Sequence, residues 1–425
     1  MPARVVIFSP GPLRGSVDVP GDKSISHRAL IAGARCAAAV RIAGLNPGRD
    51  VCATRQALAA LGARIGIDDE TNVTVAGEGL SAPAATLDCM NSGSTARMML
   101  GACAGAGIRA EFDGDDSLRR RPMEPVAAQL RAFGARIETT EGRLPLTLLG
   151  TPEIQTRRFI LLAPSAQVKS ALLFAGLFGN VAVEIFGDRG SRDHTERLLG
   201  YLGADIEWNA HSVRLGRSPL ASKEIAVAGD FSAAAFFITA AAIAPGSAIL
   251  VRSTGVNPTR TGLLDALISM GAAIELQNRR TVSNEPVADV YVEFRKLEGT
   301  SIGADVALRA IDEIPLLALA GAFAAGTTTI GGASDLRTKE SDRLAAIERL
   351  LSSVGIESSF DRGTLQVKGG APRAAGATID TQGDHRIAMA TAVLGCAAGP
   401  LSLDSDASLD VSFPGFLSAL GRLRG

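Results

Sequence analysis

The clearest pattern in the chain is a short polar segment followed by a run of small apolar residues. Six such runs begin near residues 23, 91, 165, 230, 312 and 384, and "DFSAAAFFITAAAIAPG" is one of them. A run that is apolar at almost every position predicts a helix buried on all sides. The polar segment before each run then marks the start of a buried helix.

A second phrase recurs in the same rhythm and closes an amphipathic helical pattern. Examples are "ALAALGARI" at 57–65 and "QLRAFGARI" at 129–137. Glycine in this place predicts a helix C-cap with positive φ. The marker glycines lie 66 to 84 residues apart and are Gly62, Gly134, Gly203, Gly271, Gly355 and Gly421. Six copies of both phrases predict six α/β units of about 70 residues. The longest interval predicts an insertion at 277–286, "QNRRTVSNEP".

Composition limits the classes of protein to which the chain can belong. Of its 425 residues 46% are hydrophobic and only 4% aromatic, which predicts a core of small aliphatic side chains. The net charge of −1, from 43 basic and 44 acidic residues, argues against a general nucleic-acid or membrane-surface binder. The longest small-apolar run, 233–244, is too short to cross a bilayer, and the N-terminal apolar run is too short for a signal peptide.

Cysteine and histidine usage indicates the compartment and excludes a metal site. The five cysteines form no CxxC pair, so the sequence predicts a reduced, cytoplasmic protein with most cysteines in the core. The four histidines show no HExxH or similar spacing. We therefore expect no bound metal.

Positive charge gathers at the predicted helix starts of this nearly neutral chain. Any one of these cations could simply be solvated. Because cations recur at several of the six predicted helix starts, the pattern favours an anion-binding site. The segment "GSVDVPGDKS" is not a phosphate-binding P-loop, because Asp22 separates Gly21 from Lys23. We therefore predict a small, strongly anionic substrate. The cations at the starts of the buried helices are Lys23, Arg28, Arg97, Lys169, His385 and Arg386.

Ten motifs in order carry a family resemblance that runs from about residue 10 to about 415. They are "PGDKSISHRAL", "NSGSTAR", "RRPMEP", "PSAQVKSALL", "RDHTERLL", "GDFSAAAFF", "NPTRTG", "IDEIPLLALA", "LRTKESDRL" and "GDHRIAMA". Together they resemble the 5-enolpyruvylshikimate-3-phosphate (EPSP) synthase family. The resemblance implies an α/β fold with two similar domains, each of three repeated α/β units in an inside-out α/β barrel. The implied domains are 21–228, and 1–20 with 229–425, with the active site in the interdomain cleft.

The resemblance also implies an activity. The family transfers the enolpyruvyl group of phosphoenolpyruvate (PEP) to the 5-hydroxyl of shikimate 3-phosphate and releases phosphate by addition and elimination. This step of the shikimate pathway leads toward chorismate and the aromatic amino acids, and it is the target of glyphosate. It uses no metal and no organic cofactor. We expect a cytoplasmic monomer whose partners are these two substrates, with no nucleic acid and no membrane.

Residue roles follow from the same motifs. Asp312 matches the base that takes the 5-hydroxyl proton, Glu340 matches the acid that protonates the PEP methylene, and Lys23 is the third catalytic candidate. The implied shikimate 3-phosphate site consists of Lys23, Ser24, Arg28, Ser165, Ala166, Gln167, Arg192, Asp312 and Lys339. The implied PEP site consists of Lys23, Gly93, Arg121, Gln167, Arg343 and Arg386.

Two positions depart from the family pattern. Many members carry a lysine where this chain has Val411, and many have a second serine where it has Ala166. The resemblance implies that Arg192 compensates for the serine hydroxyl.

Several residues also have a purely structural interpretation. Asp312 could be only an N-cap, and Glu340 could pair with Arg343 on a helix surface. His27 is expected to be structural, and the roles of Lys169 and His385 are open.

Two other functions stay open from the sequence. One is a UDP-N-acetylglucosamine enolpyruvyltransferase, although "DGDDSLRRRP" lacks the cysteine that such enzymes usually carry there. The other is a non-catalytic module that binds a phosphorylated metabolite. Intact Lys23, Asp312, Lys339 and Glu340 argue against it.

Overall fold

The computed structural model describes residues 7–8, 10–77, 79–155, 157–188, 190–338, 341–374, 376–405, 409 and 413–424. The chain divides into two compact units. The N-terminal unit comprises Gly21–Ala228 and Thr281–Glu285. The C-terminal unit comprises Met1–Pro20, Gly229–Arg280 and Pro286–Gly425.

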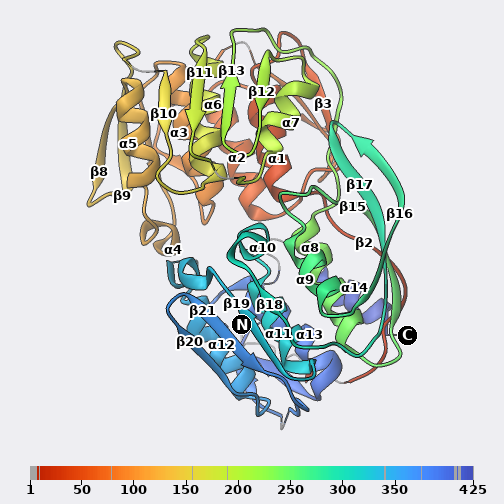
Figure 1. The fold of residues 1–425 in the computed structure, drawn as a ribbon. Helices are drawn as coiled ribbons and strands as arrows, with labels where there is room; N and C mark the ends of the chain where they lie inside the picture. The colour runs from red at the N-terminus through yellow and green to blue at the C-terminus, as the bar shows by residue number, and fades with distance from the viewer. Residues whose placement is uncertain are drawn as a thin grey trace. The chain divides into compact units, whose positions relative to one another are not determined.

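The N-terminal unit contains three α/β repeats, coloured red to light green in Figure 1. The first has α1 (Lys23–Gly33), β3 (Val40–Ala43), α2 (Arg49–Ala60), β4 (Arg64–Ile67), β5 (Val73–Ala76) and the late strand β14 (Ile225–Ala226). The second has β6 (Leu87–Asp88), α3 (Gly93–Gly105), β7 (Ala110–Asp113), α4 (Asp116–Arg119), α5 (Glu124–Phe133), β8 (Arg136–Thr140) and β9 (Arg143–Gly150). The third has β10 (Arg158–Ile160), α6 (Ala166–Phe178), β11 (Val183–Phe186), α7 (His194–Tyr201), β12 (Ile206–Trp208) and β13 (Ser212–Leu215).

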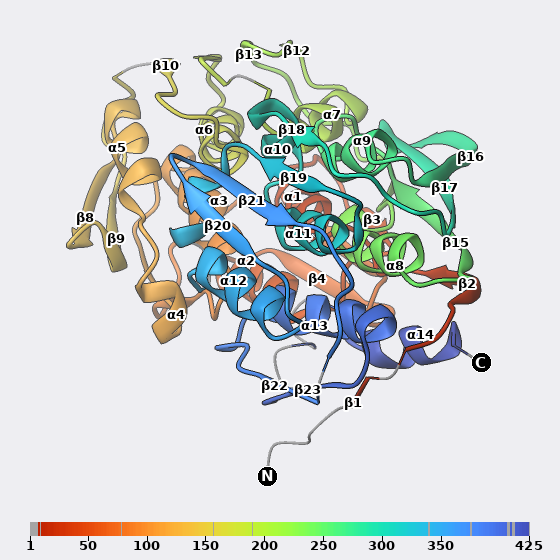
Figure 2. The same cartoon turned by 60° about the horizontal axis from the view of Figure 1, so that its bottom comes forward.

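The C-terminal unit repeats the plan three times (Figure 2). Its first repeat has β2 (Arg14–Asp18), α8 (Phe231–Ile243), β15 (Ala248–Gly255), α9 (Gly262–Ser269), β16 (Ala273–Val282) and β17 (Glu285–Glu293). The second has β18 (Ser301–Ile302), α10 (Ala304–Arg309), α11 (Ile314–Phe323), β19 (Thr327–Ile330), the 3₁₀ helix η1 (Ala333–Thr338), α12 (Arg343–Ser352), β20 (Ser358–Asp361) and β21 (Thr364–Lys368). The third has β22 (Thr378–Ile379), α13 (His385–Ala398), β23 (Leu401–Leu403), α14 (Phe416–Arg422) and β1 (Ile7–Phe8).

Each repeat has its own sheet, and the sheets share one topology. In the order β10-β11-β13-β12, the first pair is parallel and the next two pairs are antiparallel. The sheet β6-β7-β9-β8 is built the same way. Within the described residues there are five four-stranded sheets and one three-stranded sheet. The prediction of six α/β repeats in two similar halves is therefore confirmed.

The apolar runs form the buried helices, as predicted. All residues of α8 are buried, and so is most of α1, α3, α6, α11 and α13. Small residues let two of these helices touch through their backbones. A Cβ added to Gly101 of α3 would lie 2.2 Å from the carbonyl oxygen of Ala171 in α6. Small side chains therefore allow these two buried helices to pack closely.

The marker glycines behave as predicted in five of the six repeats. Gly62, Gly134, Gly203, Gly271 and Gly355 have φ between 76° and 120°. The sixth prediction is wrong: Gly421 lies inside α14, because that helix continues to Arg422 before it ends.

The predicted insertion at 277–286 is the end of a long hairpin. Strands β16 and β17 span Ala273–Val282 and Glu285–Glu293, and the tip, Thr281–Glu285, is grouped with the N-terminal unit. Its Ser283 Oγ accepts a 2.9 Å hydrogen bond from the backbone N–H of Ala226. The sequence pattern places the extra residues correctly but does not indicate where their tip packs.

Cysteine burial agrees with the sequence prediction. Cys36, Cys89, Cys103 and Cys396 are buried, Cys52 is half-buried, and all five are free thiols. Burial raises the pKa of Cys36 and of Cys396 to about 11, so these thiols stay protonated and unreactive at neutral pH. In the described part of the chain, every helix is too short or too polar to cross a membrane.

Candidate active site

The buried helices of the N-terminal unit begin with side-chain caps. The Asp22 carboxylate accepts a hydrogen bond from the Ile25 N–H at 2.9 Å. Ser92 and Ser165 do the same for the N–H groups of Thr95 and Val168, at 3.1 and 3.3 Å. Ser165, a predicted phosphate ligand, is thus also the N-cap of α6. These caps fix the first helical turns, where backbone N–H groups favour anions.

The first predicted cations are held by polar contacts at the start of α1. Lys23 Nζ lies 2.8 Å from Asp50 Oδ2 and the side chain is partly exposed. Arg28 is buried, and its guanidinium donates to the carbonyl of Ser24 at 2.8 Å. Burial lowers the pKa of Arg28 to about 10, which leaves it charged at neutral pH. The structure thus brings Lys23, Ser24 and Arg28 together within the first two turns of α1.

A second group of predicted residues surrounds the start of α3. Arg121 Nη2 donates to Asn91 Oδ1 at 2.6 Å. Arg97 Nη1 donates to Gln167 Oε1 at 2.9 Å, which links α3 to α6. A Cβ on Gly93 would lie 2.5 Å from Arg97 Nη1 and 3.7 Å from Arg121 Nη1. Gly93 is therefore flanked by two guanidinium groups, as suits a site for carboxylate or phosphate.

Two further predicted ligands lie in the third repeat. Ala166 is the first residue of α6, and its carbonyl accepts from Ser170 Oγ at 2.6 Å. Arg192 is half-buried in the segment before α7.

The structure supports the structural interpretation of His27 and restricts the role of Lys169. His27 is fully buried, and its Nδ1 lies 2.7 Å from Thr54 Oγ1; burial lowers its pKa to about 3, so it is a neutral structural residue. Lys169 is also buried, paired at 2.7 Å with both Asp188 and Glu196. Lys169 therefore neither faces solvent nor presents its charge at the surface.

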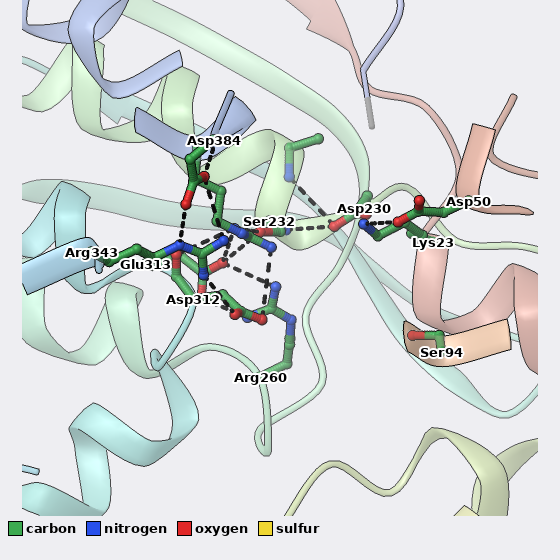
Figure 3. A network of polar contacts seen from close by, with 12 residues as sticks. Lys23, Asp50, Ser94, Asp230, Ser232, Arg260, Asp312, Glu313, Arg343 and Asp384 are labelled. Atoms are coloured by element: carbon green, nitrogen blue, oxygen red, sulfur yellow. Dashed lines mark hydrogen bonds and ion pairs between the residues drawn. The ribbon is translucent and has the colours of Figure 1, made fainter. Parts of the chain in front are cut away.

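In the C-terminal unit, Asp312 lies near two predicted arginines, of which Arg343 is labelled with it in Figure 3. Asp312 Oδ1 is 3.6 Å from Arg343 Nη1, and Oδ2 is 3.7 Å from Arg386 Nη2. The Asp312 side chain is 16% exposed, whereas Arg343 is buried. The N-cap of α11 is Glu313, so the interpretation of Asp312 as a helix cap is wrong.

Asp384, the N-cap of α13, accepts hydrogen bonds from both Arg343 and Arg386. Its Oδ2 accepts from Arg343 Nε at 2.9 Å, and its Oδ1 accepts from the backbone N–H of Arg386 at 2.9 Å. The interpretation of Arg343 as one half of a surface ion pair is also wrong, because its side chain is 1% exposed.

A buried network that sequence reasoning missed supports these arginines. Glu313 accepts hydrogen bonds from Arg260 Nη1 at 2.5 Å and from Ser232 Oγ at 2.6 Å, and Ser232 Oγ accepts from Arg386 Nη1 at 2.5 Å. Burial tends to raise the pKa of Glu313, but Arg260 and Arg386 outweigh it and lower that pKa below its ordinary value. Arg260 lies in the motif "NPTRTG" and Ser232 in "GDFSAAAFF", so these two motifs were the sequence signal that could have indicated the network.

Some predicted residues cannot be placed. Lys339, Glu340 and Val411 lie outside the described residues. His385 is buried at the first position of α13. Across the described part of the chain, no group of three or more His, Cys, Asp or Glu side chains is arranged to hold a metal ion.

The fold resembles those of solved enolpyruvyl transferase and EPSP synthase structures. The enolpyruvyl transferase NikO from Streptomyces tendae has the same fold, with a TM-score of 0.78 and 19% identity over 99% of this chain and 98% of that one. EPSP synthase from Acinetobacter baumannii matches with a TM-score of 0.88 and 35% identity, again over 99% and 98% of the two chains.

Sequence comparison then identifies the family. The family model for EPSP synthase (3-phosphoshikimate 1-carboxyvinyltransferase) matches residues 7–420. A 3-phosphoshikimate 1-carboxyvinyltransferase of Anaeromyxobacter sp. is 42% identical over 416 residues, 97% of this chain and 96% of the relative. The chain belongs to the EPSP synthase family.

Proposed function

We propose that this chain transfers the enolpyruvyl group of PEP to the 5-hydroxyl of shikimate 3-phosphate and releases phosphate. Membership in the EPSP synthase family over residues 7–420 supports this reaction. The observation that carries the site assignment is the placement of Asp312 beside Arg343 and Arg386. We further propose that the chain acts as a monomer in the cytoplasm.

The N-terminal unit is proposed to bind most of the anionic groups. Shikimate 3-phosphate would contact Lys23, Ser24 and Arg28, which lie in the first two turns of α1. Ser165, Ala166, Gln167 and Arg192 would complete the site around its phosphate. PEP would lie against Gly93, where a side chain would collide with Arg97. Arg121 suits the PEP phosphate or carboxylate, because its planar fork can donate two parallel hydrogen bonds.

Asp312 is proposed as the general base of the addition step. Its contacts to Arg343 and Arg386 are 3.6 and 3.7 Å, longer than the 2.9 Å hydrogen bond that holds Arg343 to Asp384. A carboxylate that is 16% exposed remains accessible to a hydroxyl group of the substrate. The 5-hydroxyl would give its proton to Asp312 as its oxygen bonds to C2 of PEP.

The remaining steps use residues assigned from the family resemblance. Glu340 would donate a proton to C3 of PEP, which becomes a methyl group in the tetrahedral intermediate. In the elimination, the Glu340 carboxylate would take a proton back from that methyl group as the C2–O bond to phosphate breaks, which restores the double bond and releases phosphate. Lys339 would contact the sugar phosphate, and Arg343 and Arg386 would balance the charge of PEP. The reaction needs residues of both units to act on one pair of substrates.

A coupled phosphate-release assay tests the proposal. The chain should release phosphate only when both PEP and shikimate 3-phosphate are present. Release with UDP-N-acetylglucosamine in place of shikimate 3-phosphate would instead indicate the related transferase. Binding of shikimate 3-phosphate without release would indicate a non-catalytic binding module. Either outcome would overturn the proposed reaction.

A further inference from the structure

A buried ion cluster borders the segment that carries Arg192. Lys169 projects from α6, and its Nζ lies 2.7 Å from Asp188 Oδ2 and 2.7 Å from Glu196 Oε1. The three side chains are 2%, 4% and 1% exposed. Asp188 and Glu196 lie four residues before and four residues after Arg192. One lysine therefore holds both ends of this segment.

The cluster also holds the residue immediately before Arg192. Lys169 Nζ donates to the carbonyl of Ser191 at 3.4 Å. Ser191 Oγ donates to Asp188 Oδ1 at 2.5 Å. Both the main chain and the side chain of Ser191 are thus fixed by the cluster, which limits where the next residue can place its guanidinium group.

A second contact joins the same two segments to Arg28. Ser170 Oγ, next to Lys169, lies 2.6 Å from Thr195 Oγ1, and Thr195 Oγ1 accepts from Arg28 Nε at 2.7 Å. Burial is the main influence on the pKa of Arg28 and lowers it; Glu196 raises that pKa, and Arg192 lowers it further. Arg28 is thus linked through Thr195 and Ser170 to the two segments that the cluster joins.

Stability alone gives little reason for this arrangement. Removing three charges from water costs more than packing apolar side chains of similar volume, so a buried ion cluster is weak evidence for a stabilising role. The rest of α6 is almost entirely apolar, and an apolar residue at position 169 would fit the pattern. A role in placing Arg192 beside Arg28 would explain why the cluster is there.

We propose that Lys169 is a positioning residue which, with Asp188 and Glu196, fixes Arg192 to receive, beside Arg28, the phosphate of the sugar-phosphate substrate. The proposal rests on the proposed function. It predicts that Lys169 acts on phosphate recognition through Arg192 and never touches the substrate itself.

The single tryptophan of the chain provides a direct measurement. Trp208 Nε1 donates to Asp193 Oδ2 at 3.2 Å, and Asp193 follows Arg192 directly. Fluorescence titration with shikimate 3-phosphate should therefore report binding without turnover. For Lys169→Met we expect the Kd to rise about 10- to 100-fold, the order of effect that a misplaced binding group produces. Lys223→Met, at an exposed lysine of the same unit, should leave Kd unchanged.

Selectivity for the phosphate distinguishes positioning from general damage. Competition by shikimate, which has no phosphate, should be equal in the wild type and in Lys169→Met, and so should the KM for PEP. Equal losses for shikimate, shikimate 3-phosphate and PEP would overturn the proposal.

A double-mutant cycle identifies the residue through which Lys169 acts. In an Arg192→Ala background, Lys169→Met should change the Kd for shikimate 3-phosphate by less than about twofold, because coupled residues are not additive. Full additivity would overturn the proposal. Ser191→Ala is a milder variant if Lys169→Met does not fold, and it should raise the Kd a few-fold. An unchanged Kd for Ser191→Ala would also count against the proposal.

The outcomes separate this proposal from the proposed function. If the wild type binds shikimate 3-phosphate but releases no phosphate with PEP, the proposed function fails and the cycle still decides the role of Lys169. If the wild type binds no shikimate 3-phosphate, both proposals fail.

Discussion

At the scale of single residues, the adjacent carboxylates of Asp312 and Glu313 differ in their exposure to solvent. Asp312 is partly exposed and its contacts to arginine exceed 3.5 Å, whereas Glu313 is fully buried and bonded at 2.5 Å to Arg260. A buried carboxylate held by short charge-assisted bonds is suited to fixing other side chains. The partly exposed one is suited to exchanging a proton with a substrate.

Substitution should separate the two carboxylates experimentally. Asp312→Asn keeps the size of the side chain but removes the base, so turnover should fall about 10²- to 10⁴-fold. The Kd for shikimate 3-phosphate should change much less. Glu313→Gln should instead lower the melting temperature, because breaking a buried ion pair costs about 3–5 kcal/mol. Steady-state kinetics and calorimetry on both variants check this, and near-normal turnover of Asp312→Asn would exclude it as the base.

Glu340→Gln is the matching test of the proposed acid. The same reasoning predicts a fall in turnover of about 10²- to 10⁴-fold with little change in substrate binding. Single-turnover measurements with PEP should show that addition is slowed. If the variant turns over at a rate near that of the wild type, another group protonates C3.

Substitution of Gly93 tests whether this residue lines the proposed PEP site. Gly93 is not among the residues with positive φ, so alanine does not strain the backbone there. The new methyl group would meet Arg97 Nη1 at 2.5 Å and push that side chain aside. The family resemblance describes glyphosate as longer than PEP. Gly93→Ala should therefore raise the inhibition constant of glyphosate by about tenfold or more. The KM for PEP should rise less, and equal changes in both constants would contradict the steric explanation.

At the scale of elements, helix packing depends on glycine where two backbones touch. Gly101 lies in the interior of α3, and its added Cβ would be 2.2 Å from the Ala171 carbonyl oxygen. Gly101→Ala should therefore destabilise the fold by about 1–3 kcal/mol, the usual effect of overpacking a core. Gly421 also lies inside a helix, but a Cβ there would meet nothing within 4 Å. Gly421→Ala should be neutral or slightly stabilising, and denaturant titration of both variants measures the contrast.

Buried His27 joins α1 to α2 through Thr54 and makes the stability of the N-terminal unit depend on pH. Burial is the main cause that lowers the pKa of His27 to about 3, with Lys23 and Arg28 adding to it and Asp50 and Asp22 opposing it. Between this pKa and the ordinary value of 6.5, only the unfolded chain binds the proton. Unfolding free energy should therefore fall as pH drops through this window, by up to about 1.4 kcal/mol per pH unit.

Two substitutions isolate that contribution. In His27→Gln the part of the slope due to this residue should disappear between pH 6.5 and 5. His211→Gln, at an exposed histidine, should keep the wild-type slope. Urea titrations at several pH values check the difference, and identical slopes in all three proteins would contradict it.

At the scale of the whole molecule, the proposed reaction needs groups from two compact units. The helix starts of both units carry predicted cations, and we expect these like charges to disfavour closure when no substrate is present. Shikimate 3-phosphate would supply opposite charge to both sets and favour a more compact state. Small-angle scattering should show a smaller radius of gyration with shikimate 3-phosphate than without it. An unchanged radius would contradict ligand-dependent closure.

The sequence by itself determined the features that repeat. Six apolar runs and the marker glycines specified the buried helices and five of the six C-caps, because burial on all sides and positive φ each restrict residue type strongly. The ordered motifs also indicated the family. These are local properties, and local pattern is sufficient to show them.

Only the tertiary structure decided which side chains meet. Nothing in the spacing of Lys169, Asp188 and Glu196 indicates that one lysine joins two acids in the core, or that Glu313 binds Arg260 while Asp312 stays partly exposed. The hairpin tip at Thr281–Glu285 is grouped with a unit distant in sequence for the same reason. Such contacts depend on how whole elements pack, and packing joins residues whose separation along the chain carries no periodic signal.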